Sequence, residues 1–278
     1  KYPQKEALIF EDQRYTYSDL YNQATILADK LIDLGLKKQD RVLIYMDNAP
    51  EVVISFYAAL KAGGIFTIIN SAVQVQKLSY IIGDCEPAII IADAKKAKNV
   101  IQGLKNKQLT YSIIWTGDER KYLSDDKNIS QYNWNEIFSS DLLNRKHYES
   151  KKISHNRVLD IDLAGLIYTS GSTGEPKGVM ESHYNIISAA RSIIQYLENT
   201  PDDIILNTLP LSFDYGLYQV IMAFMFGGTV VLEKSFIFLS RVLNLISKEK
   251  VTGFPIVPTI VAMIFKTIDL KSFDLSTL

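Results

Sequence analysis

The sequence predicts an α/β protein, because apolar segments of strand length alternate with longer segments of helical period along most of its 278 residues. Hydrophobic residues make up 47% of the chain and charged residues 22%, a balance that supports a sizeable buried core. The length fits one large domain or two ordinary ones.

The first part of the chain is expected to contain a small hairpin followed by alternating strands and helices. The hairpin strands are Ala7–Phe10 and Arg14–Tyr17. The next segment, Ser18–Leu34, carries leucines and alanines at helical spacing, begins on a serine and stops before Gly35, which predicts an amphipathic helix. The other predicted elements here are a helix at Ala49–Ala62 and strands at Arg41–Met46, Ile65–Ile69, Ala88–Ala92 and Ser112–Thr116.

Residues 117–156 interrupt this pattern, since they are polar, charged and rich in serine and asparagine. They are interpreted as a surface excursion rather than core. Regular structure is expected to resume after them. Strands are predicted at Leu163–Thr169, Ile204–Leu209, Thr229–Leu232 and Val251–Val257, and helices at Asn185–Leu197, Leu217–Phe226, Leu239–Glu249 and Pro258–Ile268.

Charge and cysteine content exclude several classes of function. Thirty basic and 31 acidic residues leave a formal charge of −1, which gives no electrostatic reason to expect a nucleic-acid partner. The single cysteine, Cys85, excludes an internal disulfide framework and favours a cytoplasmic protein, with Cys85 as a structural thiol. The most apolar stretch, Val220–Leu232, is too short to cross a bilayer, so no membrane partner is expected.

The strongest chemical signal is Tyr168–Val179, "YTSGSTGEPKGV", where a hydrophobic strand runs into a Ser/Thr/Gly-rich segment followed by Lys177. Glycines allow close backbone approach to an anion, hydroxyl and N–H groups donate to phosphate oxygens, and lysine adds positive charge. Pro176 stands where a Walker A loop needs glycine, which disfavours a P-loop kinase or GTPase. A plain flexible turn is the alternative, but six of the seven residues Thr169–Glu175 are Ser, Thr or Gly, which favours a phosphate loop.

This segment resembles the nucleotide-loop signature of the AMP-forming adenylate synthetases, a superfamily of acyl-CoA ligases, luciferases and the adenylation domains of nonribosomal peptide synthetases. Three further segments resemble family motifs in the same order: Tyr15–Leu20, Leu60–Ile69 and Ser182–Ile186. The chain departs from the family pattern at Asn70–Ser71, where an aspartate and a proline-rich turn often follow. That departure concerns the local loop, not the family.

The resemblance implies that residues 1–278 are an N-terminal portion of the family's large domain, with mixed sheets flanked by helices in layered subdomains. It places a first α/β subdomain at about 40–160, the nucleotide loop region at 161–182, and a second subdomain at 183–278 with residues 1–40 packed on it. Family members also carry an acidic Thr-Glu motif, a ribose-binding aspartate and a small C-terminal domain with a catalytic lysine. None of these is in the 278 residues, so no catalytic residue is assignable and this piece alone is expected not to complete adenylation.

The implied reaction is attack of a substrate carboxylate on the α-phosphorus of ATP, assisted by Mg²⁺, with release of pyrophosphate and later transfer of the acyl group to a thiol. No set of Cys, His and carboxylates has metal-ligand spacing, so Mg²⁺ is expected to arrive with ATP. The resemblance assigns phosphate binding to Thr169, Ser170, Gly171, Ser172, Thr173, Gly174 and Lys177. Their contribution would be positioning and charge stabilisation.

A second informative segment, "LPLSFDYGLYQ", puts Asp214 at a strand-to-helix junction. From the residues alone, an ordinary helix N-cap is an equally good interpretation. In the family, acyl-CoA ligases commonly carry histidine after an aromatic residue here, whereas amino-acid-activating domains carry Phe-Asp, as in Phe213–Asp214. The resemblance therefore implies that Asp214 binds the α-ammonium of an amino acid.

By the same resemblance, Tyr215, Tyr218 and Pro255 would line the substrate pocket and favour a compact side chain, proline being one candidate. Packing of Tyr218 on the sheet is an equally good interpretation. For His183, which follows the loop, a structural hydrogen-bonding role is favoured over catalysis.

Three functions remain open on the sequence. The first is amino-acid adenylation with a carrier-protein thiol as acceptor, and the second is synthesis of an acyl-CoA from a non-amino carboxylate. The third is a non-catalytic remnant that binds a nucleotide or a partner protein. Phe213–Asp214 favours the first.

Overall fold

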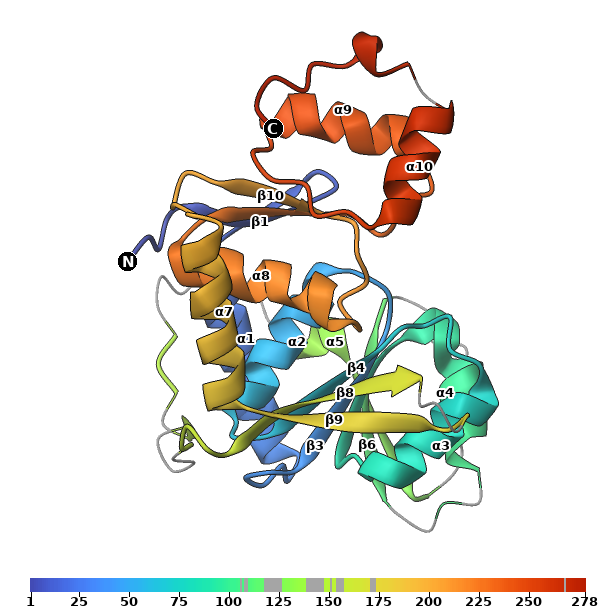
Figure 1. Cartoon of the computed structure of the whole chain (residues 1–278). Helices are drawn as coiled ribbons and strands as arrows, with labels where there is room; N and C mark the ends of the chain where they lie inside the picture. The colour runs from blue at the N-terminus through green and yellow to red at the C-terminus, as the bar shows by residue number, and fades with distance from the viewer. Residues whose placement is uncertain are drawn as a thin grey trace. The chain divides into compact units, whose positions relative to one another are not determined.

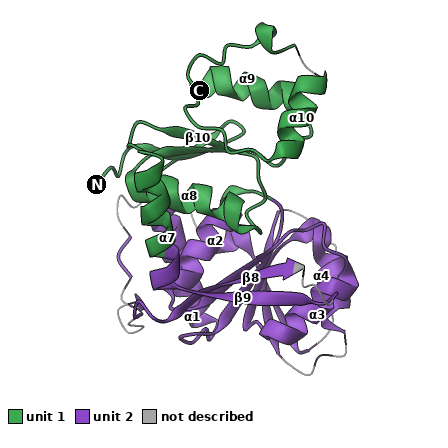
Figure 2. Cartoon of the chain, viewed as in Figure 1, with its two compact units in different colours: residues 1–18, 48–50, 187–278 green, residues 19–47, 51–186 purple. Residues whose placement is uncertain are grey.

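The structure is a computed structural model, and it describes residues 1–105, 107, 110–117, 127–138, 148–150, 152–153, 158–170, 174–267 and 269–278. The chain divides into two compact units (Figure 2). Unit 1 consists of residues 1–18, 48–50 and 187–278, and unit 2 of residues 19–47 and 51–186. The mixed α/β class predicted from the sequence is confirmed.

Unit 2 is built on a seven-stranded sheet of order β7-β6-β5-β3-β4-β8-β9, parallel except for β9. Its strands are β3 Arg41–Tyr45, β4 Ile65–Ile69, β5 Ile89–Asp93, β6 Tyr111–Thr116, β7 Ile129–Asn133, β8 Leu163–Ser170 and β9 Pro176–Ser182. Its helical segments are α1 Tyr17–Asp33, α2 Pro50–Lys61, α3 Val75–Cys85, η1 Ala94–Lys96, α4 Ala97–Leu104, α5 Trp134–Ile137 and the start of α7 His183–Tyr196.

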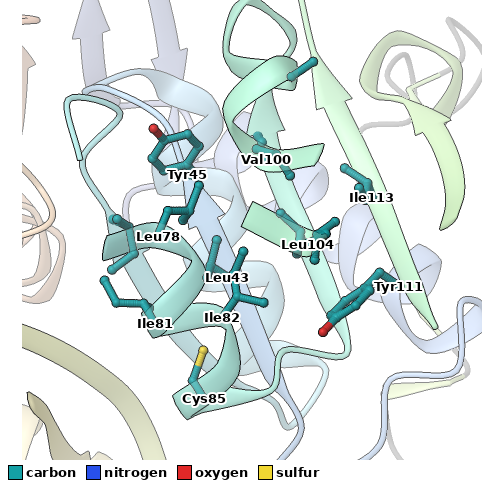
Figure 3. Packing of buried hydrophobic residues seen from close by; sticks show 14 of the residues in the cluster. Leu43, Tyr45, Leu78, Ile81, Ile82, Cys85, Val100, Leu104, Tyr111 and Ile113 are labelled. Carbon is teal, nitrogen blue, oxygen red and sulfur yellow. The ribbon is translucent and has the colours of Figure 1, made fainter. Parts of the chain in front are cut away.

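The strand order decides which face each helix covers. The chain moves one way across the sheet from β3 to β4 and the other way from β4 through β5 to β6. Because such crossovers are right-handed, α2 lies on one face, and α3 and α4 lie on the other. Helices α3 and α4 bury an apolar cluster against β3, β5 and β6 that includes Leu43, Leu78, Ile82, Val100 and Ile113 (Figure 3).

Cys85 lies in this cluster at the end of α3 (Figure 3). Burial raises the pKa of its thiol to about 12. The thiol is therefore protonated at neutral pH, as a structural cysteine should be.

Unit 1 is built on a four-stranded sheet of order β10-β11-β1-β2. Its strands are β1 Glu6–Phe10, β2 Gln13–Thr16, β10 Ile204–Asn207 and β11 Thr229–Leu232. Its helical segments are α8 Asp214–Phe226, α9 Leu239–Glu249, α10 Pro258–Thr267, η4 Leu270–Ser272 and the rest of α7. Helix α8 contacts β10 and β11, and α9 packs its apolar side on Ile9, Leu206 and Val231.

The N-terminal hairpin joins a sheet made mainly by the end of the chain. β1 pairs in parallel with β11, with Leu8 opposite Val230, more than 200 residues later. Arg14 on β2 donates hydrogen bonds to the carboxylates of Glu6 and Glu249, and the Glu249 carboxylate is buried. The guanidinium thereby ties the hairpin to α9.

Two sequence predictions need correction. Val251–Val257 is not a strand: it forms one isolated parallel bridge, between Gly253 and Ile205. Pro255 and Pro258 have no N–H to donate to a ladder, which prevents regular pairing here.

The polar excursion at 117–156 is not wholly surface. Among its described residues, Ile129–Asn133 forms β7, which extends the sheet of unit 2, and Trp134 begins α5 and is buried. β7 is a half-exposed strand at the edge of the sheet, and such strands tolerate polar side chains. For this reason its amino-acid composition resembles that of a loop.

No helix in the described part of the chain combines the length and the apolar character that crossing a membrane requires.

Candidate functional site

The predicted phosphate segment is the tip of an antiparallel hairpin formed by β8 and β9 in unit 2. Thr169 stands directly opposite Lys177, and Ser170 ends β8 opposite Pro176. Gly174 has φ +94° and is exposed, a backbone conformation that glycine adopts without strain. The described residues therefore place Thr169 on one strand of the hairpin and Lys177 on the other.

Of the residues predicted to bind phosphate, Thr169 and Lys177 are brought together in the described part of the hairpin. Thr169 and Lys177 are cross-strand partners, so their side chains share one face of the ribbon, and both residues are exposed. Gly171, Ser172 and Thr173, and the side chain of Ser170, lie outside the part of the structure that can be described. An exposed ammonium opposite an exposed hydroxyl is a suitable pair of donors for an anionic phosphate oxygen.

His183 begins α7 at the end of this hairpin. Its backbone N–H donates to the carbonyl of Asp162, and its side chain is half-buried. Partial burial lowers the pKa of the imidazole, and the nearby carboxylates of Asp162 and Asp160 act in the opposite direction. This setting suits a structural residue.

The lowered pKa of His183 predicts a pH dependence of stability. The unfolded chain binds the histidine proton near its ordinary pKa of 6.5, whereas the folded protein binds it only at lower pH. The stability contribution is therefore complete above about pH 6.5 and is lost as the pH falls below that value. We expect the melting temperature of wild type to fall between pH 7 and pH 5 more steeply than that of His183→Gln. Parallel pH profiles for the two proteins would contradict this.

Asp214 is the first residue of α8 in unit 1. The N-cap is Phe213, which makes no side-chain capping bond, and the Asp214 carboxylate accepts a hydrogen bond of 2.7 Å from the N–H of Tyr215. The residue is exposed, and no ion pair to it is found among the described residues. Asp214 is thus not an ordinary N-cap, and its carboxylate remains accessible to a cationic group.

The residues predicted to line the substrate pocket differ in burial. Phe213 and Tyr215 are exposed, whereas Tyr218 and Pro255 are half-buried. The neighbours of Pro255, Phe254 and Ile256, pack on an apolar cluster that includes Leu209. The Pro255 segment and the loop that leads to Asp214 therefore rest on the same part of unit 1.

Two buried asparagines that sequence reasoning missed hold the loop before Asp214. Asn48 donates from Nδ2 to the carbonyls of Leu209 and Glu233, and its Oδ1 accepts from the N–H of Leu211. Asn207 donates to the carbonyl of Gly216, at 2.9 Å. Each asparagine thus binds backbone groups that would otherwise be buried unpaired.

Gly216, in the first turn of α8, also helps to hold the loop before Asp214. A Cβ atom there would lie 2.4 Å from the carbonyl oxygen of Pro210 and 2.9 Å from that of Leu209. The first turn of α8 can pack this closely on the loop only because residue 216 has no side chain. The available sequence signals were an asparagine at the end of an apolar strand, Asn207, and a glycine in the first turn of a helix, Gly216.

Comparisons with known proteins agree with this architecture. The family model described as AMP-binding enzyme matches residues 1–278. The long-chain-fatty-acid–CoA ligase of Bacillus subtilis (strain 168) is 30% identical over 293 aligned residues, covering 100% of this chain and 52% of that protein. Tyrocidine synthase 3 of Brevibacillus parabrevis is 28% identical over 267 residues, covering 94% of this chain and 4% of that protein.

Two solved structures are similar over almost all of the chain. VinN in complex with L-aspartate superposes with a TM-score of 0.76 at 26% identity, covering 95% of this chain and 61% of that one. The inhibitor-bound N-terminal domain of FACL13 from Mycobacterium tuberculosis gives a TM-score of 0.80 at 26% identity, covering 100% and 65%.

The chain spans about half the length of the curated CoA ligase and a small part of the tyrocidine synthase. The family model nevertheless covers every residue, including the hairpin that carries Thr169 and Lys177. The chain belongs to the family of AMP-binding enzymes.

Proposed function

We propose that the full-length protein activates a carboxylic acid with ATP. A carboxylate oxygen of the substrate bonds to the α-phosphorus, the bond between the α- and β-phosphates breaks, and pyrophosphate leaves, giving an acyl-AMP. The observation that carries the proposal is the Ser/Thr/Gly-rich hairpin with Lys177 opposite Thr169, in a chain that the AMP-binding family model matches throughout.

In this reaction the hairpin acts by electrostatics and position. Lys177 offsets the charge of the departing pyrophosphate, and the hydroxyls of Thr169, Ser170, Ser172 and Thr173 donate to its oxygens. Gly171 and Gly174 allow the backbone to approach the phosphates. Mg²⁺ bound to ATP would supply further positive charge on the same phosphates.

The substrate that we propose is an amino acid with a compact side chain. Asp214 is exposed and pairs with no cation in the described part of unit 1, so an α-ammonium group could neutralise it. Phe213, Tyr215, Tyr218 and Pro255 would form the surrounding wall. Support comes from VinN, which was solved with L-aspartate and is 26% identical. The thiol of a carrier protein would then accept the acyl group.

A second candidate is acyl-CoA synthesis on a carboxylate without an amino group. The observation in its favour is the 30% identity, over the whole chain, to the fatty-acid–CoA ligase of Bacillus subtilis. Both candidates share the adenylation step and differ in what Asp214 contacts and in the thiol that accepts the acyl group.

The test is ATP–pyrophosphate exchange by the full-length protein with each common amino acid, several fatty acids and short dicarboxylic acids. We expect exchange with a small set of amino acids and little with fatty acids. Exchange with fatty acids alone would select the second candidate, and exchange with no acid would refute adenylation. Product analysis of the acyl transfer, with CoA and with a carrier protein offered separately, then identifies the acceptor.

A further inference from the structure

The described hydrogen-bonded pairing of β8 with the rest of its sheet stops short of the end of the hairpin that bears Thr169 and Lys177. β8 pairs with β4 only at Gly165 opposite Phe66, and the hydroxyl of Thr67 donates to the carbonyl of Leu166. Beyond that point the described ladder of β8 is to β9 alone, and β9 is the edge strand. A two-stranded ribbon is at best marginally stable in water, so its placement requires an anchor.

Tyr168 provides a contact between this ribbon and the helix layer. It directly precedes Thr169, is buried, and belongs to the apolar cluster under α3 and α4. Its hydroxyl donates a hydrogen bond of 2.5 Å to Oδ2 of Asp84, on the last turn of α3. Burial of the phenol and this acceptor raise its pKa, so the hydroxyl keeps its proton and remains a donor.

On β9, the residue opposite Tyr168 is a glycine, which leaves room for the tyrosine ring. Gly178 is the cross-strand partner of Tyr168, and a Cβ atom there would lie 3.2 Å from Cζ and 3.4 Å from the hydroxyl oxygen of Tyr168. Glycine at 178 leaves room for the ring to lie across β9 towards α3. The end of β8 and the start of β9 lie on the side of unit 2 where α3 and α4 lie (Figure 1).

We propose that Tyr168 is a positioning residue for the nucleotide: its hydrogen bond to Asp84 anchors the ribbon to α3 and so fixes Thr169 and Lys177 where they meet the phosphates. The inference rests on the proposed function, and it assigns to the buried Tyr168 a role that acts through Thr169 and Lys177. A hydrogen bond to a carboxylate is among the stronger ones available to a neutral donor. Small displacements of positioning groups produce large losses of rate.

The first experiment measures kinetics of Tyr168→Phe in the full-length enzyme. We expect kcat/KM for ATP to fall about tenfold, while KM for the carboxylate substrate stays close to wild type. Tyr111→Phe is the matched control, because Tyr111 lies in the same cluster and its buried hydroxyl has no hydrogen-bond partner among the described residues (Figure 3). That variant is expected to keep wild-type kinetics.

Asp84 variants test the same bond from the other side. Asp84→Asn keeps an oxygen that can accept from the phenol and is expected to retain most activity with ATP, whereas Asp84→Ala is expected to resemble Tyr168→Phe. If the two residues act through one bond, the double variant Tyr168→Phe/Asp84→Ala loses no more than either single variant. Fully additive losses would contradict the proposal.

Amide hydrogen exchange tests the anchor without relying on activity. We expect exchange at Lys177, Gly178 and Val179 to be about tenfold faster in Tyr168→Phe than in wild type or Tyr111→Phe. Equal rates in all three proteins would overturn the proposal, and so would faster exchange without any change in kinetics for ATP. If wild type exchanged pyrophosphate with no acid, the proposed function would fail, and the exchange rates of these amides would still decide whether Tyr168 anchors the ribbon.

Discussion

Replacing Asp214 with alanine is expected to lower kcat/KM for the preferred amino acid by about a hundredfold or more in the full-length enzyme. In the proposed complex the bound substrate covers the exposed Asp214 carboxylate and buries the ion pair. Removing one partner of a buried ion pair typically costs about 3–5 kcal/mol, and about 1.4 kcal/mol corresponds to a tenfold change in rate. The bound α-ammonium would lose its counter-charge, so the loss should appear with every amino acid. Initial rates of ATP–pyrophosphate exchange measure it.

The matched control is Asp202→Ala, which removes an exposed carboxylate from the same unit. It is expected to leave the exchange rate within about twofold of wild type, as for a change on a solvated surface. A substrate that lacks an amino group should lose little or nothing with Asp214→Ala. Wild-type activity of Asp214→Ala towards its amino acid would show that this carboxylate does not recognise the substrate.

Replacing Gly216 with alanine is expected to destabilise unit 1 and disturb the Asp214 loop, although alanine is the better helix former. Helix propensity alone would favour alanine by about 1 kcal/mol. Against this, the new Cβ would lie 2.4 Å from the backbone oxygen of Pro210, which cannot move aside as a side chain can. Overpacking of this kind typically costs about 1–3 kcal/mol, so the net sign should be destabilising.

Gly83→Ala, in α3, is the control for Gly216→Ala. There the Cβ would lie 2.5 Å from Nζ and 3.6 Å from Cε of Lys107, the end of a flexible side chain that can move away. Urea denaturation followed by circular dichroism should show a lower free energy of unfolding for Gly216→Ala and an unchanged or higher one for Gly83→Ala, where the better helix propensity of alanine is not opposed by a backbone clash. Stabilisation of the protein by Gly216→Ala would show that the first turn of α8 is not held against the loop.

Much of the fold was predictable because apolar periodicity is strong in the buried strands. β4 and β11 have the predicted bounds, and α9 does too. The N-terminal hairpin was also correct, although its pairing with β11 is a long-range contact that no local pattern encodes. The resemblance of four motifs in the family's order was enough to predict the family.

β9, α3 and the two buried asparagines were not predicted from the sequence. β9 is an exposed edge strand of polar and apolar residues without a clean alternation, and its first residues lie within the segment Tyr168–Val179 that was interpreted as a phosphate loop. α3 did carry a signal, with Leu78, Ile81, Ile82 and Cys85 at helical spacing on its buried side. The role of Asn48 could not be inferred from the sequence, because the backbone groups that it binds lie more than 160 residues away, whereas Asn207 binds backbone groups within nine residues.

The central claim is that a carboxylate oxygen of the substrate attacks the α-phosphorus of ATP. The most direct measurement uses a substrate whose carboxylate is labelled with ¹⁸O, followed by mass spectrometry of the nucleotide and phosphate products after thiol transfer. The claim predicts that AMP gains one labelled oxygen while pyrophosphate stays unlabelled. Formation of ADP together with labelled inorganic phosphate would mean attack on the γ-phosphorus and would contradict it.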